Sequence, residues 1–550
     1  MKKITLLLFV ACLPFLGCTQ KSTDDTQKLA SLCQIWGFLK YYHPTIAKGN
    51  FDWDQQLFDL IPQIKLAEGK EEISAVYLRW IETLGEVEEC ITCNEENDKE
   101  YFGKNFDLSW IDNQDLYTAE LSKKLRHIEN NRFQGDNHYV TIQPGVGNVI
   151  IKNDDAYPEQ SDPNENYRLL SLFRYWNIVE YFFPYKYQAD EDWDAVLLEM
   201  IPKFKNEEDL TKYHLAMLEL VAKIDDGHAS FTSNQTMKYF GLKYVPFISR
   251  ILDGKSVITG FFNENLAAND DLRIGDAIIS IDGKKVIDIY KEREKYFCGS
   301  NEAFKKTISF SGIFNDSIDK AQITFERNGK VEKKEIRRYD FNQFAFTGFS
   351  KGEESRTISP GVAYVNMGML EESELPAMMD SLLNFKTIIF DIRYRPHNII
   401  FPLAKFLKHD ETPFSKTLAP DIDYPGKFFW KNEPTCGDPN PDYFKGQIVL
   451  LTNYYTGSQS EYTTMALQSA KNTIVIGETT AGANGNISPF SFVGGFKTRI
   501  SGIGVFYPDG RETQRVGIVP DIPVTPTIKG MAEGRDEILE RAIEFADSGK

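Results

Sequence analysis

The chain has 550 residues, of which 42% are hydrophobic and 26% charged, an ordinary composition for a folded protein of two to four domains. Its formal net charge is −18, and no long run of Lys or Arg occurs, which argues against nucleic acid and other anionic partners. Seven cysteines in this length exclude a fold held together mainly by disulfides.

The N-terminus has the features of an export signal. Two lysines precede an apolar stretch, residues 4–16, that is too short to span a bilayer. A Gly-Cys step at Cys18 then resembles a bacterial lipobox, in which the cysteine is acylated; an ordinary cleaved signal is the alternative. We therefore expect a signal peptide over 1–17, a linker over 18–27 and a lipid anchor at Cys18. The protein would then lie in the cell envelope, either periplasmic or surface-exposed.

Cys90 and Cys93 form a CxxC pair, which in an exported protein favours a tight disulfide. A zinc site would need two more ligands at suitable spacing, and none is near in the sequence. We expect no metal.

An internal repeat dominates the N-terminal half. Residues 28–64 recur at 168–204, with an offset of 140 residues. The matching pairs are Leu29/Leu169, Ser31/Ser171, Leu32/Leu172, Trp36/Trp176, Tyr41/Tyr181, Pro44/Pro184, Asp52/Asp192, Trp53/Trp193, Asp54/Asp194, Ile61/Ile201 and Pro62/Pro202. The apolar spacing predicts, in each copy, a helix, a break at proline and a second helix beginning near Asp-Trp-Asp.

These copies define two helical units, 28–95 and 161–235, joined by a connecting region over 96–160 with one strand-like run. The copies diverge at their ends. The first runs into the CxxC segment, whereas the second ends in Asp-Asp-Gly-His at His228.

Residues 240–340 change character and predict a small β-rich module. Asp253-Gly254 and Asn328-Gly329 are turn signals between strand-like runs. From 350 to 550 the pattern alternates buried strands (VAYVNM, KTIIFDIR, QIVLLTN, NTIVIGE) with helical stretches, which indicates an α/β sheet with crossover helices. The tail, residues 530–547, predicts one amphipathic helix.

Ser458 lies at the most informative junction of this part. It follows a buried strand and a short turn, and a helix is predicted from about 459 to 470. A serine there stands beside unpaired helix-start N–H groups that could stabilise an oxyanion. Ser458 and Glu461 also form a capping box, so a helix start without catalysis explains the same residues.

Several motifs in order resemble one enzyme family. LRIGDAIISIDGKKV resembles the PDZ signature, and GSQSEY, IGETTAGANG and VGIVPDI resemble the active-site region of the tail-specific, or carboxyl-terminal-processing, serine proteases. The resemblance covers residues 210–527 and implies a crotonase-like catalytic core, with Ser458 as nucleophile and the Gln459 N–H as an oxyanion donor. It also implies that the PDZ-like module binds extended peptides, near Leu272 and Ile274.

The family's Ser–Lys scheme does not fit, because Ala483 stands where the lysine is expected. The other scheme, of the tricorn-core and retinoid-binding-protein-like branch, takes its base from an Asp-Gly-His step, which maps onto His228. An imidazole can take and return a proton at neutral pH. The third catalytic residue of that branch maps onto Glu512 or Gln514. A glycine pair that helps form the oxyanion hole is replaced by His397-Asn398, which leaves the shape of that loop open.

We therefore predict a multidomain α+β protein with an N-terminal helical repeat, a β-rich PDZ-like module and a crotonase-like α/β core. It would be an exported serine peptidase that hydrolyses polypeptides through a Ser–His acyl-enzyme, without a cofactor or a nucleic-acid partner. The alternative is a non-enzymatic lipoprotein that binds peptides or apolar ligands on the same fold.

Overall fold

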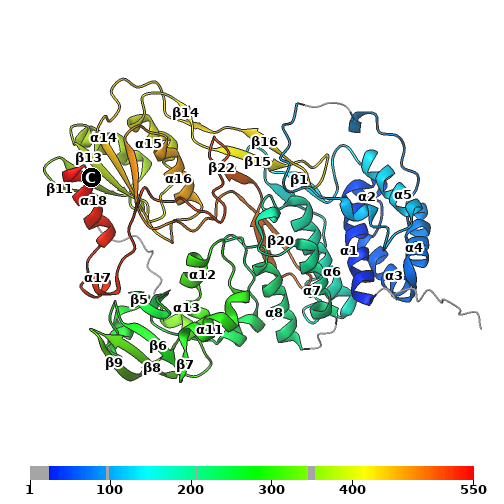
Figure 1. Ribbon diagram of the computed structural model, residues 1–550, viewed down its shortest axis with the longest axis horizontal. Coiled ribbons are helices and arrows are strands. Elements are labelled where there is room, and N and C mark those ends of the chain that lie inside the picture. The colour runs from blue at the N-terminus through cyan, green and yellow to red at the C-terminus, as the bar shows by residue number, and fades with distance from the viewer. Residues whose placement is uncertain (1–23, 95–97, 206–208, 345–353, 550) are drawn as a thin grey trace, which may run out of the picture.

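The computed structural model describes residues 24–94, 98–205, 209–344 and 354–549 (Figure 1). The predicted signal peptide and Cys18 lie outside the described residues. Within them, no helix is long and apolar enough to cross a membrane. The chain is a multidomain mixture of a helical N-terminal region, a β-rich module and a C-terminal α/β domain.

The N-terminal region is mainly helical. Its elements are α1 (Asp25–Tyr42), α2 (Pro44–Ala47), α3 (Trp53–Leu66), α4 (Gly69–Thr83), α5 (Ala119–Asn130), β1 (Val140–Ile142), β2 (Val149–Ile151), α6 (Glu165–Phe182), α7 (Trp193–Lys205), α8 (Leu210–Ala222) and α9 (Asn234–Phe240). Helices α1 and α3 recur as α6 and α7 at the predicted offset of 140 residues, which confirms the repeat.

The same tryptophan pair joins the two helices of each copy. Trp36 Nε1 donates to the Trp53 carbonyl at 3.0 Å, and Trp53 Nε1 donates back at 3.2 Å. The second copy repeats both bonds, at 2.8 Å and 3.1 Å, between Trp176 and Trp193. Each buried indole therefore has the partner that its N–H requires.

The copies also bind each other through equivalent positions. Gln34 of α1 donates to Asp194 of α7 at 3.0 Å, and Arg174 of α6 donates to Asp54 of α3. Positions 34 and 174 are related by the repeat, as are 54 and 194. The two helical units thus face each other in a two-fold-like arrangement.

The β-rich module lies below the C-terminal domain in Figure 1. Its elements are β3 (Lys243–Tyr244), β4 (Phe247–Leu252), β5 (Lys255–Phe261), α10 (Glu264–Ala268), β6 (Ala277–Ile281), β7 (Lys284–Lys285), α11 (Val286–Arg293), α12 (Glu302–Ile308), α13 (Phe310–Phe314), β8 (Lys320–Arg327), β9 (Lys330–Arg337) and β10 (Tyr339–Asp340). The main sheet has the order β4-β5-β6-β8-β9. Both predicted hairpin turns form, with left-handed φ at Asp253-Gly254 and Asn328-Gly329.

The C-terminal domain contains a six-stranded sheet of order β11-β12-β13-β18-β19-β23. Its elements are β11 (Ser355–Ser359), β12 (Val362–Asn366), α14 (Leu375–Leu382), β13 (Thr387–Asp391), α15 (Ile400–Leu407), β14 (Thr412–Pro413), β15 (Lys416–Pro420), β16 (Phe428–Asn432), β17 (Thr435–Cys436), β18 (Gln447–Thr452), α16 (Gln459–Gln468), β19 (Thr473–Gly477), β20 (Ile487–Ser491), β21 (Lys497–Ser501), β22 (Gly504–Phe506), β23 (Ile522–Pro523), α17 (Ile528–Ala532) and α18 (Glu537–Ser548).

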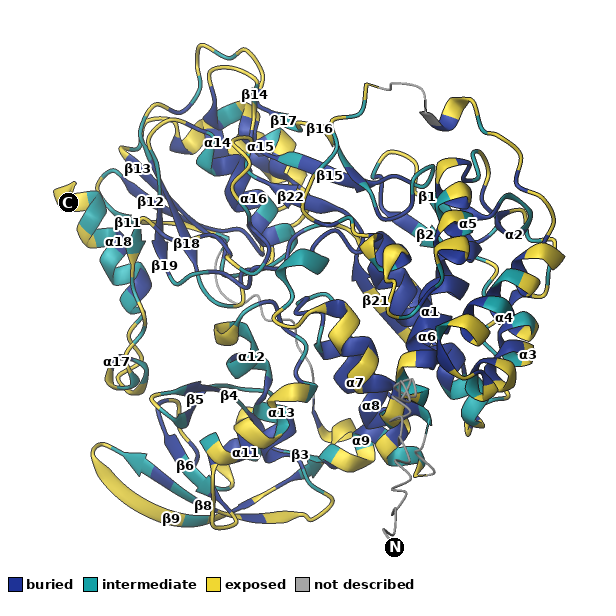
Figure 2. Cartoon of the chain, turned by 45° about the vertical axis from the view of Figure 1, so that its right-hand side comes forward, coloured by how far each residue is buried: buried dark blue, intermediate teal, exposed yellow. Residues whose placement is uncertain are grey.

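The four predicted strands of this domain, β12, β13, β18 and β19, are neighbours and run parallel. Alternate residues of these strands pack on opposite faces. Ile388 and Leu450 share a core with α14, α15 and α16, whereas Ile389 and Leu451 share one with α18. Figure 2 shows these strands buried and β9 of the module exposed. The predicted α/β sheet with crossover helices is therefore present.

One expectation about the tail was wrong. The single helix predicted over residues 530–547 is two, α17 and α18. Gly534 adopts a φ of 70° between them, and the Asp536 carboxylate caps the second helix. The glycine and the cap interrupt a pattern that periodicity alone treats as continuous.

The hairpin β20–β21 leaves the C-terminal domain and packs into the helical region. Phe490, Phe492 and Ile500 belong to the same core as α1 and α6, and the Phe492 ring stacks on Tyr175. The helical region and the C-terminal segment therefore share a core, which brings residues near 500 to the end of the second helical repeat.

Candidate active site

The candidate site lies at the carboxyl edge of the parallel sheet. Strands β13, β18 and β19 end at Asp391, Thr452 and Gly477, and the loop after each strand runs along that edge. Such an edge is where open α/β sheets bind ligands. Ser458 closes the loop after β18 and directly precedes α16.

Ser458 has an uncommon backbone conformation. Its φ is 53° and its ψ is −119°, a region that costs a non-glycine residue free energy and occurs mainly where function requires it. Its N–H donates to the carbonyl of Ala483 at 2.7 Å, which fixes the turn against the loop after β19. This sharp turn between a strand and a helix resembles the geometry that presents a nucleophilic serine.

Glu461 holds this turn from within. The side chain is fully buried and accepts hydrogen bonds from Gly482 N at 2.8 Å, Ala483 N at 3.0 Å and Ser458 N at 3.3 Å, and from the hydroxyl of Thr480. Burial raises the pKa of Glu461 to about 7, and these donors oppose that rise. The capping residue foreseen in the sequence thus also joins the loops after β18 and β19.

His228 lies in the loop that follows α8 and is largely buried. Its Nδ1 lies 2.9 Å from Ser501 Oγ, and Ser501 Oγ in turn donates to Asp226 Oδ1 at 3.0 Å. Its Nε2 is buried and has no hydrogen-bond partner among the described residues. The neutral imidazole with its proton on Nδ1 satisfies this geometry and leaves the Nε2 lone pair free.

Asp226 anchors the loop that carries His228. Its carboxylate accepts from the N–H groups of His228 and Ser501 at 3.0 and 2.7 Å, and from Gln514 Nε2 at 3.3 Å. Burial lowers the pKa of His228, the charge of Asp226 opposes this, and Arg499 and Arg395 lower the pKa further. His228 is therefore neutral at pH 7, the state that a general base requires.

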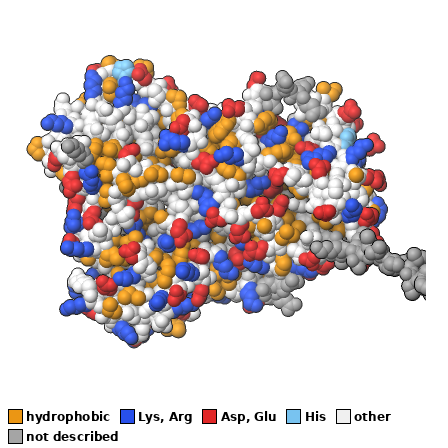
Figure 3. Space-filling view, viewed as in Figure 1, with side chains coloured by type: hydrophobic (Ala, Val, Ile, Leu, Met, Phe, Trp, Pro, Cys, Tyr) orange, Lys and Arg blue, Asp and Glu red, His pale blue; other side chains and the backbone are white. Residues whose placement is uncertain are grey.

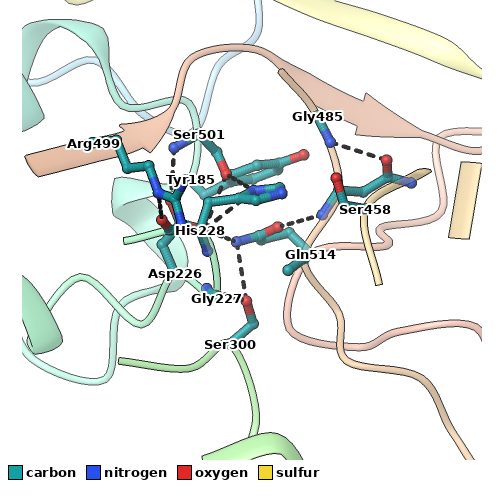
Figure 4. A network of polar contacts seen from close by, with 12 residues as sticks. Tyr185, Asp226, Gly227, His228, Ser300, Ser458, Gly485, Arg499, Ser501 and Gln514 are labelled. Carbon is teal, nitrogen blue, oxygen red and sulfur yellow. Dashed lines mark hydrogen bonds and ion pairs between the residues drawn. The ribbon is translucent and has the colours of Figure 1, made fainter. Parts of the chain in front are cut away.

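The loops of His228 and Ser458 are in contact. A Cβ placed on Gly227 would lie 2.8 Å from the Ala483 side chain, and Ala483 is the residue whose carbonyl binds the Ser458 N–H. In Figure 4, His228 and Gln514 lie between Asp226 on one side and Ser458 on the other. No hydrogen bond joins His228 to Ser458 in the described structure, and catalytic bonds often tighten only when substrate binds.

The two residues predicted as the third catalytic member take different places. Gln514 is fully buried, donates to Asp226, and accepts from Asn484 N at 3.3 Å. Glu512 instead binds Tyr187 and Gln188 at 2.9 and 2.8 Å. The carboxylate connected to His228 is Asp226, through Ser501, and the assignment of Glu512 or Gln514 as the third catalytic residue stays a prediction.

The predicted oxyanion donor lies at the start of a helix. Gln459 is the first residue of α16, so the helix offers its N–H no internal partner. His397 and Asn398, which replace the expected glycine pair, are exposed in the loop after β13, and His397 Nδ1 lies 2.9 Å from Glu371 Oε1. Arg395 of the same loop is close enough to His228 to influence its pKa.

The remaining predicted residues lie outside this cluster. Leu272 is buried in the core of the module, whereas Ile274 is exposed, so only Ile274 is accessible to a peptide. No group of three or more His, Cys, Asp or Glu side chains suited to a metal ion occurs among the described residues. Cys90 and Cys93 form the expected disulfide.

Sequence reasoning missed Ser501 and Ser300. Ser300 Oγ accepts the Gly227 N–H at 2.7 Å, and the neighbouring Asn301 donates to the carbonyls of Thr480 and Ala481 at 2.9 and 3.0 Å. The module thereby makes hydrogen bonds to the loop of His228 and to the loop after β19, which contacts Ser458. A lone serine has no local signature, so neither could be found from spacing.

Residues 361–524 match the model of peptidase family S41. The chain carries an S41 peptidase domain. This match supports a serine-type peptidase of the tail-specific protease group. No curated protein sequence matches the chain.

Solved structures agree with this fold. Mature CPAF in complex with lactacystin is 11% identical, with a TM-score of 0.56, over 70% of this chain and 99% of that chain. Mature CPAF alone is 12% identical, with a TM-score of 0.55 over the same shares. The photosystem II D1 C-terminal processing protease is 16% identical, with a TM-score of 0.38, over 68% of this chain and 98% of that one. At these identities, the two CPAF structures establish similarity of fold alone.

Proposed function

We propose that this peptidase cleaves polypeptides through an acyl-enzyme formed on Ser458, with His228 as the general base. The observation that carries the proposal is the state of His228: Nδ1 is held by Ser501 and Asp226, while Nε2 is buried and unpaired beside the loop that holds Ser458. A buried acceptor without a partner costs free energy, which a role in proton transfer explains.

In this mechanism, His228 Nε2 takes the proton of the Ser458 hydroxyl as Oγ attacks the scissile carbonyl. The imidazolium then donates that proton to the leaving amine, and water releases the acyl group by the same steps. Asp226, one hydroxyl away from the ring, stabilises the transient positive charge. The Gln459 N–H, at the positive end of α16, would bind the oxyanion.

A serine-reactive fluorophosphonate probe tests this assignment. The wild-type protein should be labelled at Ser458, and labelling should be lost in Ser458→Ala and strongly slowed in His228→Ala. Ser469→Ala, at the other end of α16, serves as the matched control and should label like wild type. Labelling of Ser458→Ala at the wild-type rate would show that another residue is the nucleophile.

We propose further that the β-rich module is PDZ-like and binds extended peptides. Its sheet, with helices α10 and α11, and the LRIGDAII motif support this. The edge strand β4 contacts α12 and α13, whereas β9 at the other edge is exposed. If the module selects substrates, Ile274→Asp should raise KM for a polypeptide and leave hydrolysis of a small ester unchanged. Equal effects on both substrates would refute peptide binding there.

We also propose that the protein is exported and lipid-anchored. The N-terminal signal and the Cys90–Cys93 disulfide support this, because disulfides persist mainly in oxidising compartments. Acidic and basic side chains are mixed over the face in Figure 3, without the basic stripe that binds nucleic acid. Cys18→Ala should release the protein from the membrane fraction, because the acyl chains provide the hold. Unchanged membrane partition would refute the anchor.

A further inference from the structure

A cavity of about 450 Å³ lies beside the candidate base. Its walls come from three parts of the chain: helices α8 and α9, the loop after His228, and the segment of the module that contains α12 and α13. This volume is within the range of about 300–1,000 Å³ that small-molecule sites occupy.

The lining of the cavity is mostly apolar, with Ser, Thr and Asn side chains as its polar part. Phe231, Met237, Phe240, Phe297 and Phe304 contribute side chains, and among the described residues none that lines the cavity carries a charge. Burying a charged group there would be costly, whereas burying an apolar group is favourable in proportion to its area. The cavity therefore suits an aromatic or branched aliphatic group.

The cavity adjoins the loop that carries His228. Gly227 and Ala229, the residues on either side of His228, both line it. Gly227 also packs against Ala483, which binds the Ser458 backbone. The loop of His228 is therefore a wall that the cavity shares with the candidate site.

Two features keep the space open. Gly312 faces Phe297, and a Cβ at this position would lie 2.5 Å from the ring, so a larger residue would force that wall to move. Ser311, also in α13, lines the cavity with a small side chain. A larger side chain at Ser311 would occupy the cavity without changing His228 or Ser458.

We propose that this cavity is a specificity pocket that binds one large apolar side chain of the polypeptide substrate. The inference rests on the proposed function, which it deepens by naming the class of residue that the enzyme selects. The side chain enters between Gly227 and α13 and is released with the product.

The test uses fluorogenic peptides that differ at one position, scanned over the residues on each side of the cleaved bond, with Phe, Ala or Asp at that position. At one position, wild-type kcat/KM should be about tenfold to a hundredfold higher for Phe than for Ala, and lowest for Asp. Ser311→Phe should lower the Phe value to that of Ala and leave the Ala peptide unchanged. Ser381→Phe, the same substitution on the exposed side of α14, should retain the preference.

A binding measurement separates this proposal from the proposed mechanism. In Ser458→Ala, the Phe peptide should bind about tenfold tighter than the Ala peptide, and adding Ser311→Phe should remove the difference. If the binding preference is present but the wild-type protein hydrolyses nothing, the mechanism fails and the pocket stands. If no position prefers Phe, or if Ser311→Phe weakens all peptides equally, the pocket is refuted. Binding of dodecanoate that Ser311→Phe abolishes, with peptide preference unchanged, would identify a lipid site instead and overturn the proposal.

Discussion

The two helical repeats share one frame but end differently. Both copies carry the reciprocal tryptophan pair, and helices α4 and α8 occupy equivalent positions. In the first copy, the residues after the last helix, Glu86 and Glu88, are exposed, and the chain runs into the Cys90–Cys93 disulfide. The equivalent residues of the second copy, Asp226 and His228, are packed against the C-terminal segment.

One pair of equivalent residues shows how the two copies differ in their contact with that segment. Ser31 of the first copy bonds to Tyr77 of its own unit at 2.7 Å. Ser171 of the second copy instead accepts the N–H of Val493, between β20 and β21, at 3.2 Å. The duplicated helices thus form a common scaffold, and the candidate site lies where a distant segment packs on one of them.

The strongest test of this comparison exchanges equivalent positions for alanine. His228→Ala should lower kcat/KM for a peptide by about a million-fold, because base and nucleophile act as one unit. Glu88→Ala, 140 residues earlier, should leave it unchanged. Steady-state peptide hydrolysis measures both, with circular dichroism as the check on folding. Wild-type turnover by His228→Ala would contradict the claim that only the second repeat contributes to catalysis.

A second pair of equivalent residues, Asp226 and Glu86, tests the role of the Asp226 carboxylate. Asp226→Asn should lower kcat by about a hundredfold to ten-thousandfold, since the carboxylate no longer stabilises the imidazolium. Glu86→Gln, the matched control, should have no effect.

The pH profile separates this role from a structural one. The base works when neutral, so burial, which lowers the pKa of His228, places the acid limb of wild-type kcat/KM below pH 6.5. Asp226 raises that pKa, so its neutralisation should move the limb to still lower pH. A loss of rate with an unmoved limb would mean that Asp226 only supports the loop.

Both copies contain the same tryptophan pair. Equivalent substitutions in the two copies should therefore lower the free energy of unfolding by similar amounts. Trp193→Phe and Trp53→Phe each remove one buried hydrogen bond to a helical carbonyl, at about 0.5–1.5 kcal/mol. Trp53 also stacks on Trp80, with ring centroids 5.1 Å apart, so its loss should cost more. Urea unfolding midpoints measure the difference. A larger loss for Trp193→Phe would show that the second copy carries more of the stability.

Removal of the disulfide at the end of the first repeat should have the smallest effect on stability. Replacing both Cys90 and Cys93 by Ser should cost about 2 kcal/mol or less, because the disulfide closes a very short loop. Peptide hydrolysis should be unchanged. A large loss of activity would mean that the first repeat also supports the site, contrary to the comparison.

The sequence by itself determined the features that depend on short-range patterns. The hairpin turns at Asp253-Gly254 and Asn328-Gly329 follow from residues that tolerate left-handed φ, and the four parallel strands follow from short apolar runs. The repeat is visible because eleven residue pairs recur at one offset. Ser458 could be predicted because a strand, a turn and a capping box are adjacent along the chain.

Only the tertiary structure decided how His228 is held. Its partner Ser501 is 273 residues away, and Gln514 reaches Asp226 across 288 residues. No local pattern encodes such pairs, since they exist only because β20–β21 packs into the helical core. The same packing excludes Glu512 from the cluster and brings Ser300 into it. Local propensities set the elements of this protein, and the burial of one hairpin against one repeat set its candidate active site.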